Sequence, residues 1–389
     1  MNNIFSDTKE AFSLKSDFEL NRAFFLFRII GSSTFVKLTS SLTKFALKFH
    51  LPVTPIIKAT VFDHFCGGVS EEDCIPVINK IFDKNVYSVL DFSTEGFDSE
   101  NEFDECLRKK ISIIDFVKNR KEIPFAVFKP TCLGSSELFK KVSKFEKLND
   151  SENDSWNRVI QRFDKVCSKA FKENIKILID AEEVEVQNAI DDLAIKMMRK
   201  YNIKSPIVFN TVQMYRKDRL GYLNEMISNK LNNDITLGLK LVRGAYMEKE
   251  RNLANSINIE SPICDSKLET DKNFNSGLEF IFNNLNRTSF VCASHNEDSI
   301  FKVMEMMKLK GLRTNDDNVW FGQLYGMSDN ISYNLASRNY NTFKILPFGS
   351  VKNLMPYLIR RAEENTSVQG QTGRELQLIT KEKKRRSSI

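Results

Sequence analysis

Eight short runs of β-branched and aromatic residues recur along this chain, and they constrain its fold more than any other feature. The runs lie at residues 87–93, 125–131, 176–182, 207–215, 237–246, 289–296, 319–327 and 342–349. Longer, charged stretches of helical character separate them, as in consecutive βα units that build a parallel sheet. Parallel strands that are buried on both faces have nearly continuous apolar sequences, and eight of them can close. The sequence therefore predicts an α/β fold, a (β/α)8 TIM-type barrel.

The length of the chain fits one barrel with an extension. A barrel of this type needs about 250 residues, and the chain has 389. We expect residues 1–86 to be an N-terminal helical arm, with amphipathic stretches at 18–30 and 35–49. The barrel is expected over 87–380 and a basic tail over 381–389. Two polar stretches, at 149–155 and 252–272, are interpreted as loop insertions.

Composition argues against several classes of protein. Hydrophobic residues make up 41% of the chain and charged residues 28%, as in globular proteins. The apolar stretches fall far short of the ~20 residues of a transmembrane helix. The first ten residues lack the pattern of a signal or organelle presequence, so we expect a cytoplasmic protein. The three histidines and seven scattered cysteines lack metal-site spacing, so no metal site is predicted, and the cysteines are interpreted as reduced thiols.

The formal net charge of +6 is concentrated near the C-terminus, in KEKKRR at residues 381–386. Such a tail is commonly a solvated chain end. The alternative is peripheral contact with an anionic membrane surface, to which each basic residue contributes about 1 kcal/mol. No other feature suggests nucleic-acid binding, so no nucleic-acid partner is expected.

Polar side chains collect towards the C-terminal ends of most apolar runs, which is where a barrel binds its ligands. They could merely mark strand ends. Because seven of the eight runs carry one, a shared site is the better interpretation. The residues are Asp91, Lys129, Asp180, Gln213, Arg243, His295 and Gln323.

A helix expected over residues 351–365 adds two adjacent guanidinium groups. Tyr357, Arg360, Arg361 and Glu364 are spaced i, i+3, i+4 and i+7, so they share one helical face. Two arginines side by side can form a fork for a carboxylate, with the tyrosine as a wall and the glutamate as a holding partner. The alternative is an ordinary salt-bridged face in contact with solvent.

Further charges stand within the apolar runs. Lys129 and Asp180 are costly to bury unless an opposite charge meets them, so they suggest a small anionic substrate or an ion pair with each other. Lys240 and Arg243 precede Gly244, an arrangement that suits a phosphate or an electron-rich ring. The chain has neither a G-x-G-x-x-G motif after a strand nor a P-loop motif, so neither nucleotide site is predicted.

Several motifs in order closely resemble the proline dehydrogenase family over residues 128–378. They are LIDAEE at 178–183, NTVQMY at 210–215, LKLVRGAY at 239–246, ASHN at 293–296, FGQLYGM at 321–327 and YLIRRAEEN at 357–365. The segment HFCGG at 64–68 is similar to that of the monofunctional branch. The resemblance implies oxidation of L-proline to 1-pyrroline-5-carboxylate by hydride transfer to FAD. It also implies that a membrane quinone accepts the electrons, in the first step of proline degradation to glutamate.

The resemblance also assigns residues. It implies that Lys129, Arg360 and Arg361 hold the proline carboxylate and that Tyr357 lines the pocket. The positions implied to bind FAD are Ala181, Gln213, Lys240, Arg243, Gly244, Ala245, Ser294, His295 and Glu364.

Two of these positions differ from common family residues, because Lys240 stands where many relatives have Arg and Ser294 where Thr is common. Asp180 and Lys240 are implied to be catalytic. Asp180 would orient the basic cluster, while the Lys240 cation would favour reduced, anionic flavin. Glu364 would pair with Arg361.

Other functions remain as alternatives. A hydroxyproline dehydrogenase would use the same scaffold and differ only in how its pocket treats one ring hydroxyl. A barrel lyase could use Lys129 as a Schiff-base nucleophile, and it would be colourless and trapped by borohydride. A non-catalytic module that binds membrane or DNA would leave the cluster at the barrel mouth unexplained.

Overall fold

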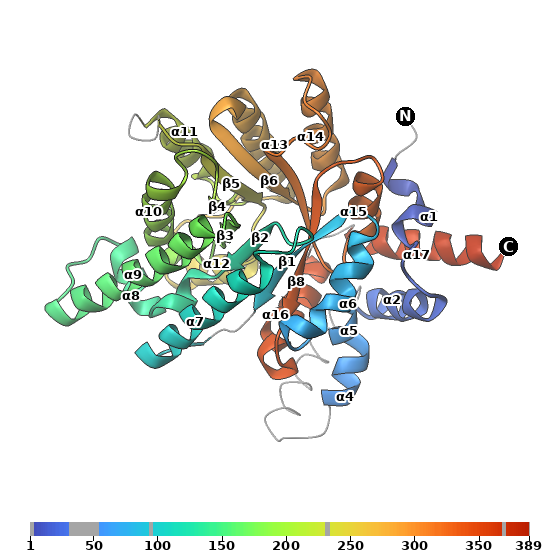
Figure 1. The fold of residues 1–389 in the computed structure, drawn as a ribbon, viewed down its shortest axis with the longest axis horizontal. Helices are drawn as coiled ribbons and strands as arrows, with labels where there is room; N and C mark the ends of the chain where they lie inside the picture. The colour runs from blue at the N-terminus through green and yellow to red at the C-terminus, as the bar shows by residue number, and fades with distance from the viewer. Residues whose placement is uncertain (1–3, 31–53, 93–95, 230–233, 368–370, 389) are drawn as a thin grey trace. The chain divides into compact units, whose positions relative to one another are not determined.

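Eight parallel strands form a closed barrel in the order β1 to β8, which confirms the predicted α/β barrel. The structure is a computed structural model, and it describes residues 4–30, 54–92, 96–229, 234–367 and 371–388 (Figure 1). The strands are β1 (Val86–Phe92), β2 (Phe125–Phe128), β3 (Lys176–Ile179), β4 (Val208–Gln213), β5 (Leu237–Val242), β6 (Thr288–Ala293), β7 (Val319–Leu324) and β8 (Thr342–Phe348). Each predicted run overlaps one strand, and β1 and β6 begin one residue before their runs.

Most strands end before the predicted run does. β2 ends at Phe128 and β3 at Ile179, so Lys129 and Asp180 lie in the loops that follow. β5 ends at Val242, and Arg243 and Gly244 also lie beyond it. The C-terminal polar residues of these runs are therefore loop residues placed by strands.

The chain divides into two compact units, and each is described by itself. Unit 1 comprises Met1–Thr94, His295–Asp298 and Phe321–Ile389, and it contains β1, β8 and most of β7. Unit 2 comprises Glu95–Ser294 and Ser299–Trp320, and it contains β2 to β6.

Helices alternate with the strands of unit 2, and polar side chains set where several begin. They are α7 (Glu100–Val117), η3 (Pro130–Leu133), α8 (Ser136–Ser143), α9 (Asp150–Lys172), α10 (Val184–Tyr201), α11 (Arg219–Ser228), α12 (Met247–Ser256), α13 (Lys267–Asn283) and η5 (Leu285–Arg287). Helix α14 (Glu297–Leu309) also lies mostly in this unit. At α7, Ser99 and Glu102 form a capping box, in which each side chain accepts the backbone N–H of the other residue.

Of the two predicted loop insertions, 149–155 is helical, whereas 252–272 is helical at its ends and a loop at 257–266. The stretch 149–155 is the start of α9, because Asn149 and Glu152 form a capping box with both N···O distances at 2.9 Å. The stretch 252–272 contains the end of α12 and the start of α13, where the Ser266 hydroxyl accepts the N–H of Glu269. The loop prediction is therefore wrong for 149–155 and for the two ends of 252–272, where polar residues act as helix caps and first turns, and it is confirmed for 257–266.

Aromatic side chains fill the core of unit 2. Phe128 and Phe163 meet edge to face with ring centroids 5.2 Å apart, and Phe125 lies 5.6 Å from Phe209. Such pairs stabilise a core beyond the area that they bury.

All seven cysteines of the chain are buried free thiols, in agreement with the expectation that they are reduced.

Unit 1 contains the N-terminal and C-terminal helices. They are η1 (Ile4–Ser6), α1 (Thr8–Ala11), α2 (Asp17–Ile30), α4 (Thr54–Ile57), the π-helix η2 (Lys58–Phe62), α5 (Asp63–Phe65), α6 (Glu71–Phe82), α15 (Asp329–Ala336), α16 (Val351–Ser367) and α17 (Gln371–Ser387). The helix predicted at 18–30 is confirmed as α2, whereas the stretch 35–49 lies outside the described residues. None of the helices in the described parts of the chain is both long and apolar enough to cross a bilayer.

Helix α17 packs beside α2 within unit 1 (Figure 1). Leu378 and Ile379 of α17 join Leu20, Ala23 and Phe27 of α2 in one buried cluster. The basic residues expected in a tail form the last turns of α17, and several have partners there. Arg386, for example, donates to the carbonyl oxygens of Phe12 and Lys15, both at 2.9 Å.

A buried network of charges joins the N-terminal segment to β8, α15 and α17. Lys344 is fully buried, and its ammonium lies 2.9 Å from one oxygen of Asp329, while Lys15 lies 3.1 Å from the other. Burial acts to raise the pKa of Asp329, but the two cations hold it well below its usual range. Glu375 completes the network, because its carboxylate accepts the backbone N–H of Ser328 at 2.5 Å. Burial raises the pKa of Glu375 to about 7.

Candidate functional site

Candidate site residues of unit 2 gather at the C-terminal ends of β2 to β6. Asp180 follows β3, Gln213 is the last residue of β4, and Lys240 stands within β5. Strands β4 and β5 are paired, with Thr211 opposite Lys240 and Gln213 opposite Val242. Because the strands are parallel, their ends share one rim of the sheet. The sequence-based grouping of these residues is therefore supported within unit 2.

Lys240 and Asp180 form an ion pair. The Lys240 side chain is almost fully buried, whereas that of Asp180 is 23% exposed. Asp180 is fixed from behind, since its backbone N–H donates to the carbonyl oxygen of Phe128 at 3.0 Å. The cation of this ion pair comes from β5, whereas the suggested core pair between Lys129 and Asp180 stays a prediction.

The side chain of Lys129 is less buried than we expected from the apolar residues that precede it in the sequence. It follows β2 as the residue before η3, and its side chain is half-buried. Its charge acts to lower the pKa of the buried Glu182 carboxyl, which places Lys129 in the electrostatic field of the β3–α10 loop. Strand β2 ends at Phe128, the residue before Lys129, because the proline that follows Lys129, Pro130, has no N–H to donate to a neighbouring strand.

Gln213 is buried and holds an unusual acceptor. Its amide nitrogen donates to the backbone carbonyl of Glu182 at 2.8 Å, while its buried oxygen has no hydrogen-bond partner among the described residues. Buried amide oxygens are nearly always satisfied. An unpartnered oxygen at a strand end is the feature expected where a ligand supplies the donor.

Arg243 is held in one orientation by four contacts. Its guanidinium donates to Asp271 at 2.8 Å, to Ser294 at 2.8 Å and to Ser299 at 3.0 Å. It also lies over the ring of Phe274, 4.4 Å from the centroid. The side chain remains 23% exposed, so it presents a fixed positive charge that a ligand can reach.

Gly244 approaches the ring of Tyr215 closely. Its φ is +136°, and an added Cβ would lie 2.5 Å from the tyrosine ring. Glycine is therefore required here by packing and by backbone conformation. The next residue, Ala245, is exposed, and Ala181 in the β3–α10 loop is half-buried.

His295 belongs to unit 1. Its Nδ1 lies 2.9 Å from the hydroxyl oxygen of Ser328. Ser328 has a left-handed backbone with φ of 51°, and Glu375 accepts its N–H. This chain of contacts fixes the orientation of the imidazole ring.

The arginine pair also belongs to unit 1, on α16. Tyr357 and Arg361 are mostly buried, and the Arg361 guanidinium lies over the Tyr357 ring, 5.4 Å from its centroid. Arg360 is half-buried. Their burial disfavours the alternative of a fully solvated salt-bridged face. The side chain of Glu364 lies outside the described residues, so its predicted pairing with Arg361 stays a prediction.

One of the seven polar residues at run ends has a clear packing role. The Gln323 side-chain oxygen accepts the Ser332 hydroxyl at 2.8 Å, which ties β7 to α15. Gln323 is almost completely buried. For this residue the simpler interpretation, a polar side chain that serves the fold, is the better one.

Sequence reasoning assigned no role to several residues that hold the site. Asp271 and Ser299 fix Arg243, and Glu182 holds both Gln213 and the loop after β2. Glu182 was visible only as one letter of the motif at 178–183. Asp271 fell in a stretch that was interpreted as a loop. Their partners are 28 to 56 residues away in the chain, so no local pattern identifies them.

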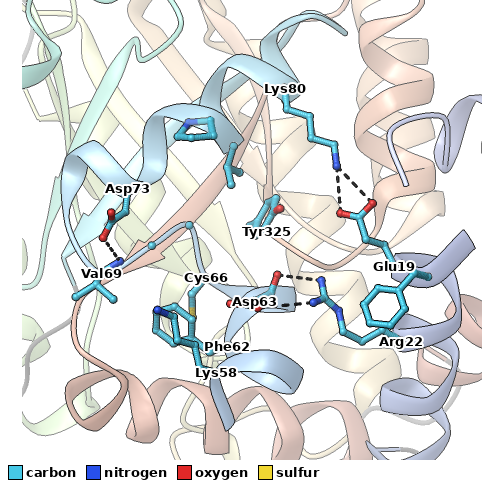
Figure 2. A pocket seen from close by; sticks show the side chains of 15 residues that line it. Glu19, Arg22, Lys58, Phe62, Asp63, Cys66, Val69, Asp73, Lys80 and Tyr325 are labelled. Carbon is cyan, nitrogen blue, oxygen red and sulfur yellow. Dashed lines mark hydrogen bonds and ion pairs between the residues drawn. The ribbon is translucent and has the colours of Figure 1, made fainter. Parts of the chain in front are cut away.

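Two pockets differ in their relation to the predicted residues. In unit 1, a pocket of about 590 Å³ contains none of the predicted site residues among its lining residues. Its charges are largely paired (Figure 2), with Lys80 3.1 Å from Glu19 and Arg22 3.9 Å from Asp63. In unit 2, a pocket of about 140 Å³ is lined by Thr131, Ser136, Glu182, Glu183, Val186 and Tyr246. Two residues of the second pocket, Glu182 and Tyr246, directly follow the candidate site residues Ala181 and Ala245 in the sequence.

Comparison with known proteins gives one consistent family. A family model described as proline dehydrogenase matches residues 74–374. The carbapenem antibiotics biosynthesis protein CarD of Pectobacterium carotovorum subsp. carotovorum is 31% identical over 322 residues, covering 83% of each chain. Mitochondrial proline dehydrogenase 1 of Dictyostelium discoideum is 30% identical over 429 residues, covering 98% of this chain and 74% of that protein.

Among solved structures, proline utilization A (PutA) from Bdellovibrio bacteriovorus inactivated by N-propargylglycine has a similar fold. The TM-score is 0.70 at 18% identity, over 95% of this chain. The present chain spans 37% of the PutA chain. At this identity the likeness supports the barrel fold alone.

Proposed function

Because the chain belongs to the proline dehydrogenase family, we propose that it oxidises L-proline to 1-pyrroline-5-carboxylate with FAD as cofactor. A membrane quinone would then receive the electrons. The matched region, residues 74–374, includes every predicted site residue. The observation that carries the proposal is the group formed by Gln213, Lys240 and Asp180, a buried acceptor and a paired buried cation on neighbouring strands.

The residues of unit 2 fit FAD. A flavin ring carries an N–H donor, and the buried oxygen of Gln213 needs one. The flavin ring also gains negative charge on reduction, for which Lys240 offers a buried cation. Arg243 offers a fixed guanidinium that suits a phosphate or an aromatic ring. The remaining residues proposed to bind FAD are Ala181, Gly244, Ala245, Ser294, His295 and Glu364.

When bound, FAD would supply the two-electron acceptor for this oxidation. The chain would hold the charges around it. Asp180 would keep the Lys240 ammonium in one position, since the two are ion-paired. Ser294 would act on Arg243, whose guanidinium donates to its hydroxyl at 2.8 Å.

The substrate would be held by its carboxylate. We assign Lys129, Arg360 and Arg361 to this role, with Tyr357 beside the proline ring. The Arg361 guanidinium already lies over the tyrosine ring, so its orientation is set before substrate arrives. The ring nitrogen of proline would enter as the neutral amine, because a positive charge on this nitrogen would be repelled by the cationic residues around it.

The proposed setting is the cytoplasmic face of a membrane, where a quinone can be reached. We propose peripheral contact, without a spanning helix. Lys384 is exposed on the last turns of α17 and available to an anionic surface. Arg386 is engaged by partners within unit 1, so it contributes less to such contact.

Turnover with different acceptors and substrates tests this proposal. Purified protein should oxidise L-proline much faster with a soluble quinone than with NAD, and acid precipitation should release its FAD into the supernatant. Comparable turnover with NAD would contradict the quinone assignment. A higher kcat/KM for trans-4-hydroxy-L-proline than for L-proline would make the protein a hydroxyproline dehydrogenase. Borohydride trapping of substrate on Lys129 in a colourless protein would instead indicate the lyase.

A further inference from the structure

Glu182 is a buried carboxyl group that none of the proposed steps uses. It lies in the loop between β3 and α10 and is 9% exposed. Burial raises the pKa of its carboxyl, against the opposing effects of hydrogen bonds from Thr131 and the charge of Lys129. A buried carboxyl is costly unless several donors meet it. Its contacts therefore indicate what the group is kept for.

The side chain of Glu182 holds the loop after β2. One carboxylate oxygen accepts the backbone N–H of Thr131 at 2.8 Å, and the other accepts the Thr131 hydroxyl at 2.6 Å. Thr131 lies in η3, two residues after Lys129. These two bonds fix the short segment that presents the Lys129 ammonium.

The backbone of Glu182 holds the end of β4. Its carbonyl oxygen accepts an N–H of the Gln213 side chain at 2.8 Å. This bond uses the amide nitrogen of Gln213 and leaves the amide oxygen for a ligand. Glu182 thus contacts both the segment that carries Lys129 and the strand end that carries Gln213, the residues proposed to bind substrate and cofactor respectively.

Glu182 is itself anchored from α10. Its backbone N–H donates to the side-chain oxygen of Gln187 at 2.8 Å, and Gln187 donates to Asp191 at 2.8 Å. Arg219 then holds Asp191 at 2.7 Å, with both side chains buried. A continuous set of buried hydrogen bonds rigidifies the residues that it joins.

We infer that Glu182 is a positioning residue that sets Lys129 for the substrate carboxylate and Gln213 for the cofactor at the same time. The inference rests on the proposed function and adds a residue that touches neither ligand. The short contacts through Thr131 serve substrate affinity, whereas the carbonyl contact serves cofactor retention. Substitution of Glu182 removes the side-chain contacts to Thr131 and keeps the backbone carbonyl, so it can act on Gln213 only by loosening the loop that carries this carbonyl.

The test uses Glu182→Ala, Glu182→Gln and, as a matched control, Glu183→Gln in the FAD-loaded full chain. Glu183 is the adjacent carboxylate, but it pairs with Lys249, whose side chain is 64% exposed. Glu182→Ala should raise KM for L-proline by about tenfold, the value of one good hydrogen bond to a charged group, while kcat changes far less. Pyrrolidine, which lacks the carboxylate, should show little change in KM. Glu182→Gln should recover most of the loss, because Thr131 can still donate its N–H and its hydroxyl can accept from the amide.

Release of FAD gives a second readout that does not depend on activity. Flavin fluorescence after dilution should rise faster for Glu182→Ala than for wild type or Glu183→Gln, because loss of both Thr131 bonds loosens the loop whose backbone carbonyl holds Gln213. Unchanged KM and FAD release in Glu182→Ala, or equal effects from Glu183→Gln, would overturn the inference. If wild-type protein retained FAD but did not oxidise proline, the proposed function would fail, and FAD release would still decide the role of Glu182. Should Glu182→Ala not fold, Thr131→Val removes only the hydroxyl bond, and it should raise KM without faster FAD release.

Discussion

Replacing Glu375 by Gln should remove a pH dependence from the stability of this protein. Burial raises the pKa of the Glu375 carboxyl to about 7 from the usual 4.5, with Asp329 adding to the effect and Lys344 and Lys15 opposing it. The folded state therefore keeps a proton that the unfolded state has already released. The contribution of this carboxyl group to the free energy of unfolding is therefore fully present below pH 4.5, and it is lost as the pH rises through 7.

The size of the effect follows from that difference in pKa. A rise from 4.5 to about 7 corresponds to about 3 kcal/mol. Glu375→Gln keeps an oxygen for the Ser328 N–H but does not titrate. Between pH 4.5 and 8, the wild type should thus lose about 3 kcal/mol of unfolding free energy relative to the variant.

Urea unfolding followed by helical circular dichroism at several pH values measures this difference. His64 also makes the unfolding free energy depend on pH, and this effect must be separated from that of Glu375. Burial lowers the pKa of His64 to about 3, so its contribution to stability falls as the pH decreases below 6.5. Subtracting the variant from the wild type cancels that contribution. Glu382→Gln on the same helix is the control. The arginines beside Glu382 hold its pKa at about 2 against burial, so it should leave the profile above pH 5 unchanged. A constant wild-type minus Glu375→Gln difference from pH 5 to 8 would refute the reasoning.

Three further predictions concern other substitutions. Met in place of Arg360 or Arg361 should raise KM for L-proline by at least about tenfold, with kcat also falling for Arg361; unchanged KM in both variants would refute the carboxylate assignment. Arg386→Met should cost about 1–3 kcal/mol of unfolding free energy, since it removes bonds to two carbonyls and Asp17, whereas the exposed Lys384→Met should change it by under about 0.5 kcal/mol. Gly244→Ala should lower the melting temperature, with a cost of at least about 1 kcal/mol because φ is positive and a tyrosine ring fills the space; an unchanged melt would contradict this.

The strands were predictable from sequence because burial on both faces leaves an unbroken apolar signal. Each of the eight runs overlaps one strand, in the predicted order. Boundaries at their C-terminal ends were less accurate, since polar loop residues such as Lys129 continue the apparent run. The stretch 149–155 was assigned to a loop, although Asn149 and Glu152 together form a capping box there. Such polar clusters are ambiguous, because the same residue types favour loops and helix starts.

The partners of charged residues were the least predictable part of the site. Asp180 and Lys240 were both singled out, but their pairing spans 60 residues and depends on the order of strands. Glu182 and Asp271 gave no local signal, because their roles come from contacts across loops. Residue type and motif order thus indicated which side chains matter. Only the fold shows which of them hold the others.

Absorbance of the purified protein across the visible flavin bands, recorded without oxygen before and after L-proline is added, tests the central claim most directly. The protein should be yellow as purified, and the bands should bleach on addition of L-proline. Bleaching reports cofactor, substrate and electron transfer in one measurement. A colourless protein that binds no added FAD, or flavin bands that L-proline leaves unchanged, would contradict the proposal that this barrel is an FAD-dependent proline dehydrogenase.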